Sequence, residues 1–212
     1  MRVYGMPVLA KDKPMKIGYA DPPYPGCAHL YAAHEDFAGE VDHAVLIQQL
    51  QANFDGWVLH TSSVALPQIA PLVPAGARIM AWVKGFAAFK RNVSVAYAWE
   101  PVIVKPARKP VVSKRLVMRD WIESPITLRR GLTGAKPEKV CHWAFEVVGA
   151  RPEDDLCDLY PGTGAVTRAW AVWQGMFALP VSAIQFKTID AAVTFEEISS
   201  ALPQTVTHAD KT

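Results

Sequence analysis

The sequence predicts an α/β fold in which short strands and helices alternate along the chain. Short runs rich in branched and aromatic residues are bounded by proline or glycine, which is typical of buried strands. Stretches with apolar residues at helical spacing separate several of these runs. Because strands that alternate with helices favour crossover connections, we expect a parallel sheet.

The first half of the chain supplies most of the expected strands. Residues 16–24 predict a strand that ends at a double proline, because proline donates no ladder hydrogen bond and fixes its own φ. Residues 41–54 place apolar side chains close to helical spacing, and Gly56 follows them, so they predict a helix. Further strands are expected over residues 57–60, 78–83 and 94–104, with a helix over 64–72.

The second half predicts a long insertion and then two helices. Residues 105–135 contain three prolines and two glycines, so they are expected to form an insertion or a functional loop. A helix over 136–148, a strand over 155–160 and a helix over 165–173 complete the pattern. We therefore predict one domain over residues 1–180, with a basic insertion at about 105–135, and a partly flexible C-terminal extension over 181–212.

Composition narrows the class of protein. Of 212 residues, 50% are hydrophobic and 20% are charged, which is ordinary globular composition and too apolar for disorder over most of the chain. No apolar run reaches membrane-spanning length, and residues 1–16 lack a signal-peptide core. The 3 cysteines are widely spaced, which predicts neither a disulfide framework nor a zinc site. We expect a cytoplasmic protein with no membrane partner and no metal.

Positive charge is concentrated in one segment. Residues 105–139 hold ten Lys and Arg against three Asp and Glu, whereas the whole chain has a net charge of only +2. Such a segment can neutralise phosphates, with counterion release supplying affinity. It can equally be a solvated basic loop, and both interpretations stay open at this point.

Asp21, Pro22, Pro23 and Tyr24 form the most informative motif. An aromatic amine is a poor nucleophile, because its lone pair is delocalised into the ring. A carboxylate and a backbone carbonyl can accept the two amine N–H groups, and a rigid double proline keeps these acceptors fixed. Tyr24 can stack on a base extruded from a duplex. A simple turn that closes a strand is the alternative interpretation.

A second motif runs from Asp158 through Tyr160 and Pro161 to Gly162 and Gly164. It joins a predicted strand to a predicted helix. Its glycines allow the backbone to approach a ligand closely, and the helix N-terminus can receive a carboxylate. Tight turns of this kind without ligands are common, so the motif is weak by itself.

Together the two motifs resemble those of the S-adenosylmethionine-dependent amino-methyltransferases of DNA. In a circularly permuted class of that family the Asp-Pro-Pro-Tyr motif comes first, a helix with Lys-Pro follows, and the glycine motif comes last. Here Lys136 and Pro137 open the helix between the two motifs. The resemblance therefore implies an enzyme that methylates N6 of adenine in DNA.

The resemblance also implies a Rossmann-like methyltransferase sheet with helices on both faces and the two motifs side by side at the carboxyl ends of their strands. S-adenosylmethionine is the expected cofactor, and it needs no metal. The expected catalytic residues are Asp21, Pro22, Pro23 and Tyr24. The expected cofactor contacts are Ala20, Asp21, Lys136, Pro137, Asp158, Tyr160, Pro161, Gly162 and Gly164.

The basic segment becomes the expected nucleic-acid surface once the resemblance is considered. Its expected phosphate contacts are Arg108, Lys109, Lys114, Arg115, Arg119, Arg129 and Arg130. DNA is the preferred partner over RNA, because the RNA enzymes usually carry Trp at the position of Tyr24. Methylation of cytosine N4 and a catalytically silent nucleic-acid-binding homologue remain alternatives, and the oligomeric state, a homodimer included, stays open.

Overall fold

The computed structural model describes residues 13–32, 39–86, 93–108, 118–127 and 135–178, all of which lie in one compact unit, residues 1–178. The extension predicted over 181–212 lies outside the described residues. Within the described part, no helix combines the length and the apolar character needed to cross a bilayer.

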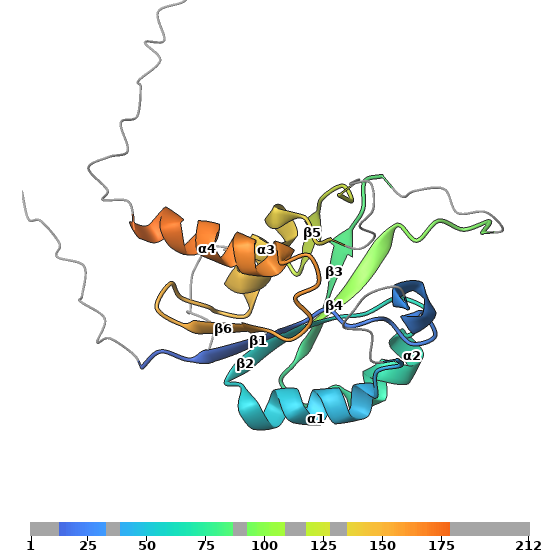
Figure 1. The fold of residues 1–212 in the computed structure, drawn as a ribbon, viewed down its shortest axis with the longest axis horizontal. Helices are drawn as coiled ribbons and strands as arrows, with labels where there is room; N and C mark the ends of the chain where they lie inside the picture. The colour runs from blue at the N-terminus through green and yellow to red at the C-terminus, as the bar shows by residue number, and fades with distance from the viewer. Residues whose placement is uncertain (1–12, 33–38, 87–92, 109–117, 128–134, 179–212) are drawn as a thin grey trace, which may run out of the picture. The chain divides into compact units, whose positions relative to one another are not determined.

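A six-stranded sheet forms the centre of this unit (Figure 1). Across the sheet the strands are β5 (Trp121–Glu123), β3 (Arg78–Val83), β4 (Trp99–Lys105), β2 (Gly56–His60), β1 (Lys16–Ala20) and β6 (Asp155–Asp158). Strand β1 pairs in parallel with both β2 and β6. The strands predicted from branched and aromatic runs are therefore neighbours in a Rossmann-like α/β fold.

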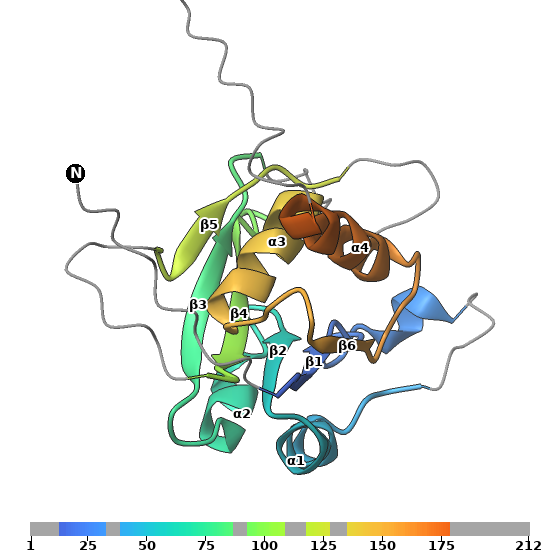
Figure 2. The ribbon, with the colours of Figure 1, turned by 90° about the vertical axis from the view of Figure 1, so that its left-hand side faces the viewer.

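Helices cover both faces of the sheet (Figure 2). On one face lie α1 (His43–Asn53), α2 (Leu66–Ile69) and the 3-10 turn η2 (Ala70–Leu72). On the other face lie α3 (Glu138–Val147) and α4 (Ala165–Ala178). A further 3-10 turn, η1 (Ala28–Tyr31), follows β1. Because both faces are covered, all five residues of β2 are buried.

The two cores have different compositions. On the α3 and α4 face, Phe145 meets the rings of Trp170 and Trp173 edge-on, with centroids 5.0 and 5.8 Å away. On the α1 face, aliphatic side chains of Leu46, Ile47 and Leu50 pack against the sheet. Asp42 caps α1, because its carboxylate accepts the backbone N–H of Ala44 and of Val45 at 2.9 and 3.1 Å.

The expectation of a parallel sheet is wrong at one strand. Strand β4 runs antiparallel to both β2 and β3. Antiparallel neighbours need no crossover helix, whereas parallel neighbours do, and no helix is described between β3 and β4. The strand also begins at Trp99, later than the predicted start at residue 94.

The segment predicted as an insertion belongs partly to the sheet. Strand β5 pairs in parallel with β3, and the side chains of Met118, Ile122 and Ile126 pack against the core on the α3 face. The indole N–H of Trp82 donates to the backbone oxygen of Ser124 at 2.8 Å. Residues 118–127 are therefore part of the folded domain, not of a loop beyond it.

Candidate active site

The two sequence motifs meet at one edge of the sheet. In the parallel pair of β1 and β6, Tyr19 is aligned with Asp158, and the backbone N–H of Leu159 donates to the oxygen of Tyr19 at 2.9 Å. Asp21 follows the last residue of β1, just as Leu159 follows the last residue of β6. The predicted adjacency of the motifs at the carboxyl edge, where open α/β sheets bind ligands, is therefore present in the fold.

The Asp-Pro-Pro-Tyr segment forms a compact turn. The backbone N–H of Cys27 donates to the oxygen of Tyr24 at 2.8 Å, and the phenol of Tyr24 lies 3.5 Å from Oδ1 of Asp21. Burial, together with the carboxylates of Glu100 and Asp21, raises the pKa of Tyr24 well above its usual value. Tyr24 therefore keeps its proton and acts as a neutral aromatic ring with a hydroxyl donor.

The buried side chain of Lys136 contacts this turn and binds Asp21 directly. Its Nζ is 2.8 Å from Oδ1 of Asp21, 3.2 Å from Oε1 of Glu100 and 3.3 Å from the hydroxyl of Tyr24. Burial opposes the charge of Lys136, but the carboxylates of Asp21 and Glu100 outweigh it and raise its pKa. Lys136 was expected to contact the cofactor, and that role stays a prediction; the contact with Asp21 was not expected.

The charged pair belongs to a larger group, which we call the buried charge network: Tyr19, Asp21, His60, Lys84, Glu100 and Lys136. Nδ1 of His60 is 2.9 Å from Oε1 of Glu100, and Nε2 of His60 is 2.7 Å from the hydroxyl of Tyr19. Lys84 reaches Oε2 of Glu100 at 3.1 Å. Burial opposes the charge of Glu100, but Lys136 and His60 outweigh it and lower its pKa.

Sequence reasoning missed Glu100, His60 and Lys84. A signal was present, because Glu100 stands inside an apolar strand and His60 ends another. Polar side chains in such strands are costly unless they find partners. An acid and a histidine on two predicted strands were therefore candidates for such a pair, although the sequence does not show that these strands are neighbours.

Three side chains of the buried charge network, those of Asp21, His60 and Glu100, are of the types that bind metal ions. Ligand atoms of Asp21, His60 and Glu100 all lie within 4.8 Å of one another. However, the ammonium of Lys136 contacts both carboxylates, at 2.8 and 3.2 Å, and therefore takes the place that a cation would occupy. We therefore assign charge compensation in this network to lysine.

The glycine motif forms a turn with left-handed backbone. Gly162 and Gly164 have φ values of 45° and 69°, in a region that side chains rarely adopt. The N–H of Gly164 donates to the oxygen of Pro161 at 2.6 Å, and the oxygen of Gly164 accepts from Arg168 at 3.0 Å within the first turn of α4. The turn thus presents the bare backbone of two glycines, on either side of Thr163, beside the N-terminus of α4.

Asp158 has an unpaired oxygen beside this turn. Its Oδ2 lies 3.3 Å from the hydroxyl of Thr167, but its Oδ1 is buried and has no hydrogen-bond partner among the described residues. Burial raises the pKa of Asp158. A buried carboxylate oxygen without a partner fits a ligand that donates a hydrogen bond there.

The basic segment divides into three groups. Lys109, Lys114, Arg115, Arg129 and Arg130 lie outside the described residues. Arg119 is exposed, and its guanidinium lies 5.2 Å from the ring of Trp121, which is itself 40% exposed. Arg119 and Trp121 therefore present a cation and an aromatic face to solvent.

Arg108 forms the third group, and its guanidinium is bound within the protein. Its guanidinium makes two hydrogen bonds to the carboxylate of Asp154, at 2.6 and 2.7 Å, and one to the oxygen of Gly149 at 2.8 Å. The side chain of Arg108 is only 11% exposed, and that of Asp154 is fully buried. Arg108 therefore joins β4 to the segment before β6 and has a structural role.

We expect Arg108→Met to lower the free energy of unfolding by about 3–5 kcal/mol, because it leaves a buried carboxylate without its charged partner. Burial opposes ionisation of Asp154, but hydrogen bonds from Arg108 and two backbone amides lower its pKa. This stability is therefore complete above the unfolded pKa of about 4 and is lost as the pH falls further. Urea denaturation at several pH values measures it.

The exposed pair of Arg78 and Asp120, whose side chains are 61% and 54% exposed, provides the matched control. Arg78→Met should cost no more than about 1 kcal/mol. Equal losses for the two variants would contradict the structural role of Arg108.

Comparisons with known proteins found matches among solved structures alone. No family model and no curated protein matches the chain. The crystal structure of an M1.HpyAVI–SAM complex is 20% identical, covers 76% of this chain and 80% of that chain, and has a TM-score of 0.47. A crystal structure of M1.HpyAVI is 16% identical over 76% of this chain and 78% of that chain, with a TM-score of 0.46. Likeness at this level of identity concerns the fold.

Proposed function

We propose that this protein transfers a methyl group from S-adenosylmethionine to the exocyclic amine of a nucleobase, with N6 of adenine in DNA as the preferred acceptor. The observation that carries the proposal is the alignment of the two motifs on paired strands. It brings the strand that leads into the carboxylate turn, Asp21 to Tyr24, beside the strand that leads into the glycine turn, Gly162 to Gly164. A methyl donor and an amine acceptor must meet at such a junction.

The glycine turn has the features that the cofactor needs. The backbone at Gly162 and Gly164 admits close approach, the N-terminus of α4 favours a carboxylate, and the unpaired Oδ1 of Asp158 can accept an ammonium or hydroxyl donor. Tyr160, Pro161, Ala20, Lys136 and Pro137 are the further proposed contacts. S-adenosylmethionine would supply a sulfonium methyl group: the amine would form the C–N bond as S-adenosylhomocysteine leaves with the C–S electron pair, and the surplus N–H proton would pass to solvent.

The carboxylate turn can hold that amine. Oδ1 of Asp21 is engaged by Lys136, whereas Oδ2 has no hydrogen-bond partner among the described residues and can accept one amine N–H. The carbonyl of Pro22 is the proposed acceptor for the second N–H. Tyr24, which stays protonated, offers a ring on which the base can stack. These acceptors favour the pyramidal, nucleophilic form of the amine.

The buried charge network holds the carboxylate of Asp21 in place. Lys136 donates to Asp21, and Glu100 compensates the remaining charge of Lys136 with help from His60 and Lys84. The raised pKa of Tyr19 leaves its hydroxyl able to donate to His60, so the histidine can donate its other N–H to Glu100. Lys136, Glu100 and His60 are therefore positioning residues for the proposed reaction.

DNA binding is proposed for the basic segment, with Arg108 now removed from it. Charge reversal of both Arg129 and Arg130 should weaken DNA binding and lower the slope of log affinity against log salt by about 2, because each lost phosphate contact removes nearly one unit. Reversal of Arg78, which is exposed at the amino end of β3, is the control and should leave the slope unchanged. If reversal of Arg129 and Arg130 leaves the slope unaltered, the segment is an ordinary basic loop.

Binding of S-adenosylmethionine tests the first half of the proposal and separates an enzyme from a silent homologue. Calorimetric titration of the full chain should show saturable binding, with competition by S-adenosylhomocysteine. A folded chain that binds neither compound would exclude the methyltransferase. The RNA and cytosine N4 alternatives share this cofactor, so only identification of the methylated nucleoside separates them.

A further inference from the structure

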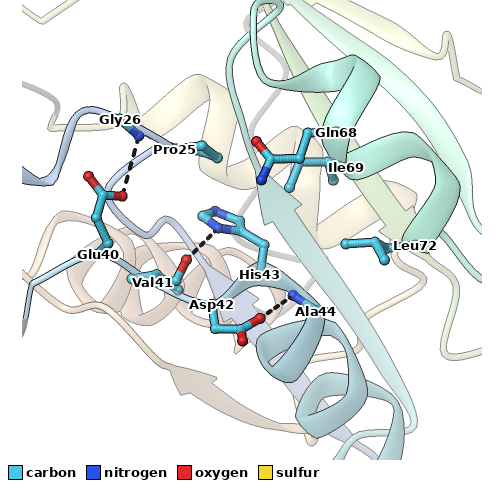
Figure 3. A pocket seen from close by; sticks show the side chains of 10 residues that line it. All are labelled: Pro25, Gly26, Glu40, Val41, Asp42, His43, Ala44, Gln68, Ile69 and Leu72. Carbon is cyan, nitrogen blue, oxygen red and sulfur yellow. Dashed lines mark hydrogen bonds between the residues drawn. The ribbon is translucent and has the colours of Figure 1, made fainter.

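A separate pocket of about 550 Å³ adjoins the carboxylate turn (Figure 3). Its walls come from Pro25 and Gly26, from residues 40–44 at the start of α1, and from α2 with η2. The volume lies within the roughly 300–1,000 Å³ of ordinary ligand pockets. Neither Asp21 nor Tyr24 lines it, so it is distinct from the proposed methyl-transfer site.

His43 supplies the chemistry of this pocket. The residue is only 5% exposed, and Nδ1 of its ring lies 2.9 Å from the backbone oxygen of Val41. Since a carbonyl can only accept, Nδ1 is the protonated nitrogen in the tautomer that makes this bond. Nε2 then presents a lone pair, and it is buried with no hydrogen-bond partner among the described residues. Figure 3 shows the ring between the Pro25 turn and Gln68.

An unpartnered buried acceptor indicates a ligand that donates a hydrogen bond, since buried polar atoms are normally paired. The N-terminus of α1 does not compete for this role, because the carboxylate of Asp42 already accepts the first free amides of the helix. The ligand must therefore carry an N–H or O–H group that reaches Nε2 of His43.

The negative charges around the pocket disfavour binding of a phosphate group. Among the described residues, its charged lining residues are Glu40 and Asp42, and none is Lys or Arg. Glu40 accepts the amides of Gly26 and Ala28 at 3.3 and 3.4 Å, which holds a negative charge at the rim. Pro25, Ile69 and Leu72 add apolar wall. A neutral, flat ring with an N–H donor on its edge fits both the charge and the walls.

We propose that this pocket binds a second nucleobase of the substrate strand, next to the base that is methylated, through an exocyclic amine donated to Nε2 of His43. The proposal rests on the proposed function, because it assumes a nucleic-acid substrate. Chain continuity supports it: Tyr24 belongs to the methyl-transfer site, Pro25 lines the pocket, and adjacent Cα atoms are only about 3.8 Å apart. The pocket then reads the sequence context of the methylated base.

Nitrogen NMR of the histidine rings in the full chain tests the pocket without any need for methyl transfer. Titration with adenosine or cytidine should shift the Nε2 resonance of His43 in a saturable manner. Purine riboside, which lacks the exocyclic amine, should bind there at least about tenfold more weakly, because Nε2 stays unpaired. His142, whose Nε2 is already 3.1 Å from the oxygen of Ala169, is the internal reference and should not move.

Three variants make the result specific; the two at His43 lack its resonance, so their nucleoside affinities are measured by calorimetric titration. His43→Gln places an amide near the position of Nε2 and should keep the preference for adenosine over purine riboside, whereas His43→Phe should remove it. Gln68→Trp, at an exposed residue that lines the pocket, should block the shift of His43 without touching the acceptor.

The second-base pocket and the proposed function can be refuted separately. A chain that methylates DNA but shows no shift of His43 with either nucleoside would overturn the second-base pocket alone. An equal response to adenosine and purine riboside would overturn it as well. A chain that shows the selective shift but transfers no methyl group would refute the methyltransferase and leave the pocket as a base-binding site.

Discussion

Replacement of Asp21 by Ala should lower the rate of methyl transfer by about a hundredfold or more, with the affinity for S-adenosylmethionine nearly unchanged. The free Oδ2 of Asp21 is the proposed acceptor for an amine N–H, and loss of one preorganised polar contact commonly costs this much. The contact matters more in the transition state than in the ground state, so turnover should fall more than binding. Single-turnover kinetics and cofactor titration measure the two effects separately.

Asp155→Ala is the matched control for this variant. Asp155 is an exposed carboxylate at the amino end of β6, the opposite end of the sheet from Asp21, and its backbone N–H donates to Met15 at 3.0 Å. Its loss should leave turnover unchanged. Parental turnover in Asp21→Ala would refute the proposed mechanism.

The second large effect is expected at Gly164. A Val there should reduce the affinity for S-adenosylmethionine by about a hundredfold or more, because a branched side chain cannot adopt a φ of 69° without strain of roughly 1–2 kcal/mol. Its Cβ would also lie 3.1 Å from the guanidinium of Arg168. The turn must change shape, and with it the backbone that faces the cofactor. Calorimetric titration of the folded variant measures the loss.

Two other glycines separate this effect from general destabilisation. Gly76 has a φ of 82°, and a Cβ there would lie 3.1 Å from Nζ of Lys105, so Gly76→Val carries a similar strain away from the glycine motif. It should lower stability without lowering cofactor affinity. Gly175→Ala, in open space on α4, should do neither. Equal cofactor affinity of Gly164→Val and the parent would show that the turn is not the cofactor site.

The parts of the fold with strong local signals were predictable. Strand β3 has the bounds predicted from its branched and aromatic run, and β1 ends just before the double proline. Helix α1 ends at Asn53, shortly before Gly56, where the sequence predicted its end. These features depend on backbone rules that act within a few residues, so a single sequence is enough to reveal them.

Features that depend on distant partners were not predictable. The direction of β4 is decided by pairing with β2 and β3, and β5 is too short to show a strand pattern. Arg108 carries the same charge as its neighbours, but the buried carboxylate of Asp154, far along the chain, gives it a structural role. Local composition does not contain such information.

The candidate site shows the same division. Asp21 and Gly164 stand in recognisable motifs, whereas Glu100 and His60 become meaningful only when the sheet brings them to Lys136. His43 is similar, because its free Nε2 is visible only once Nδ1 is seen to bind Val41. Sequence motifs therefore located the proposed chemistry, and the fold supplied the residues that hold it in place.

Methyl transfer itself tests the central claim most directly. The full chain is incubated with S-adenosylmethionine carrying a deuterated methyl group and with DNA or RNA, and the nucleosides are then separated by mass. We expect deuterated N6-methyl-2′-deoxyadenosine from DNA, and its loss in Asp21→Ala. A chain that binds S-adenosylmethionine but labels no nucleoside in either nucleic acid would contradict the claim that Asp21 and the glycine turn form one methyl-transfer site.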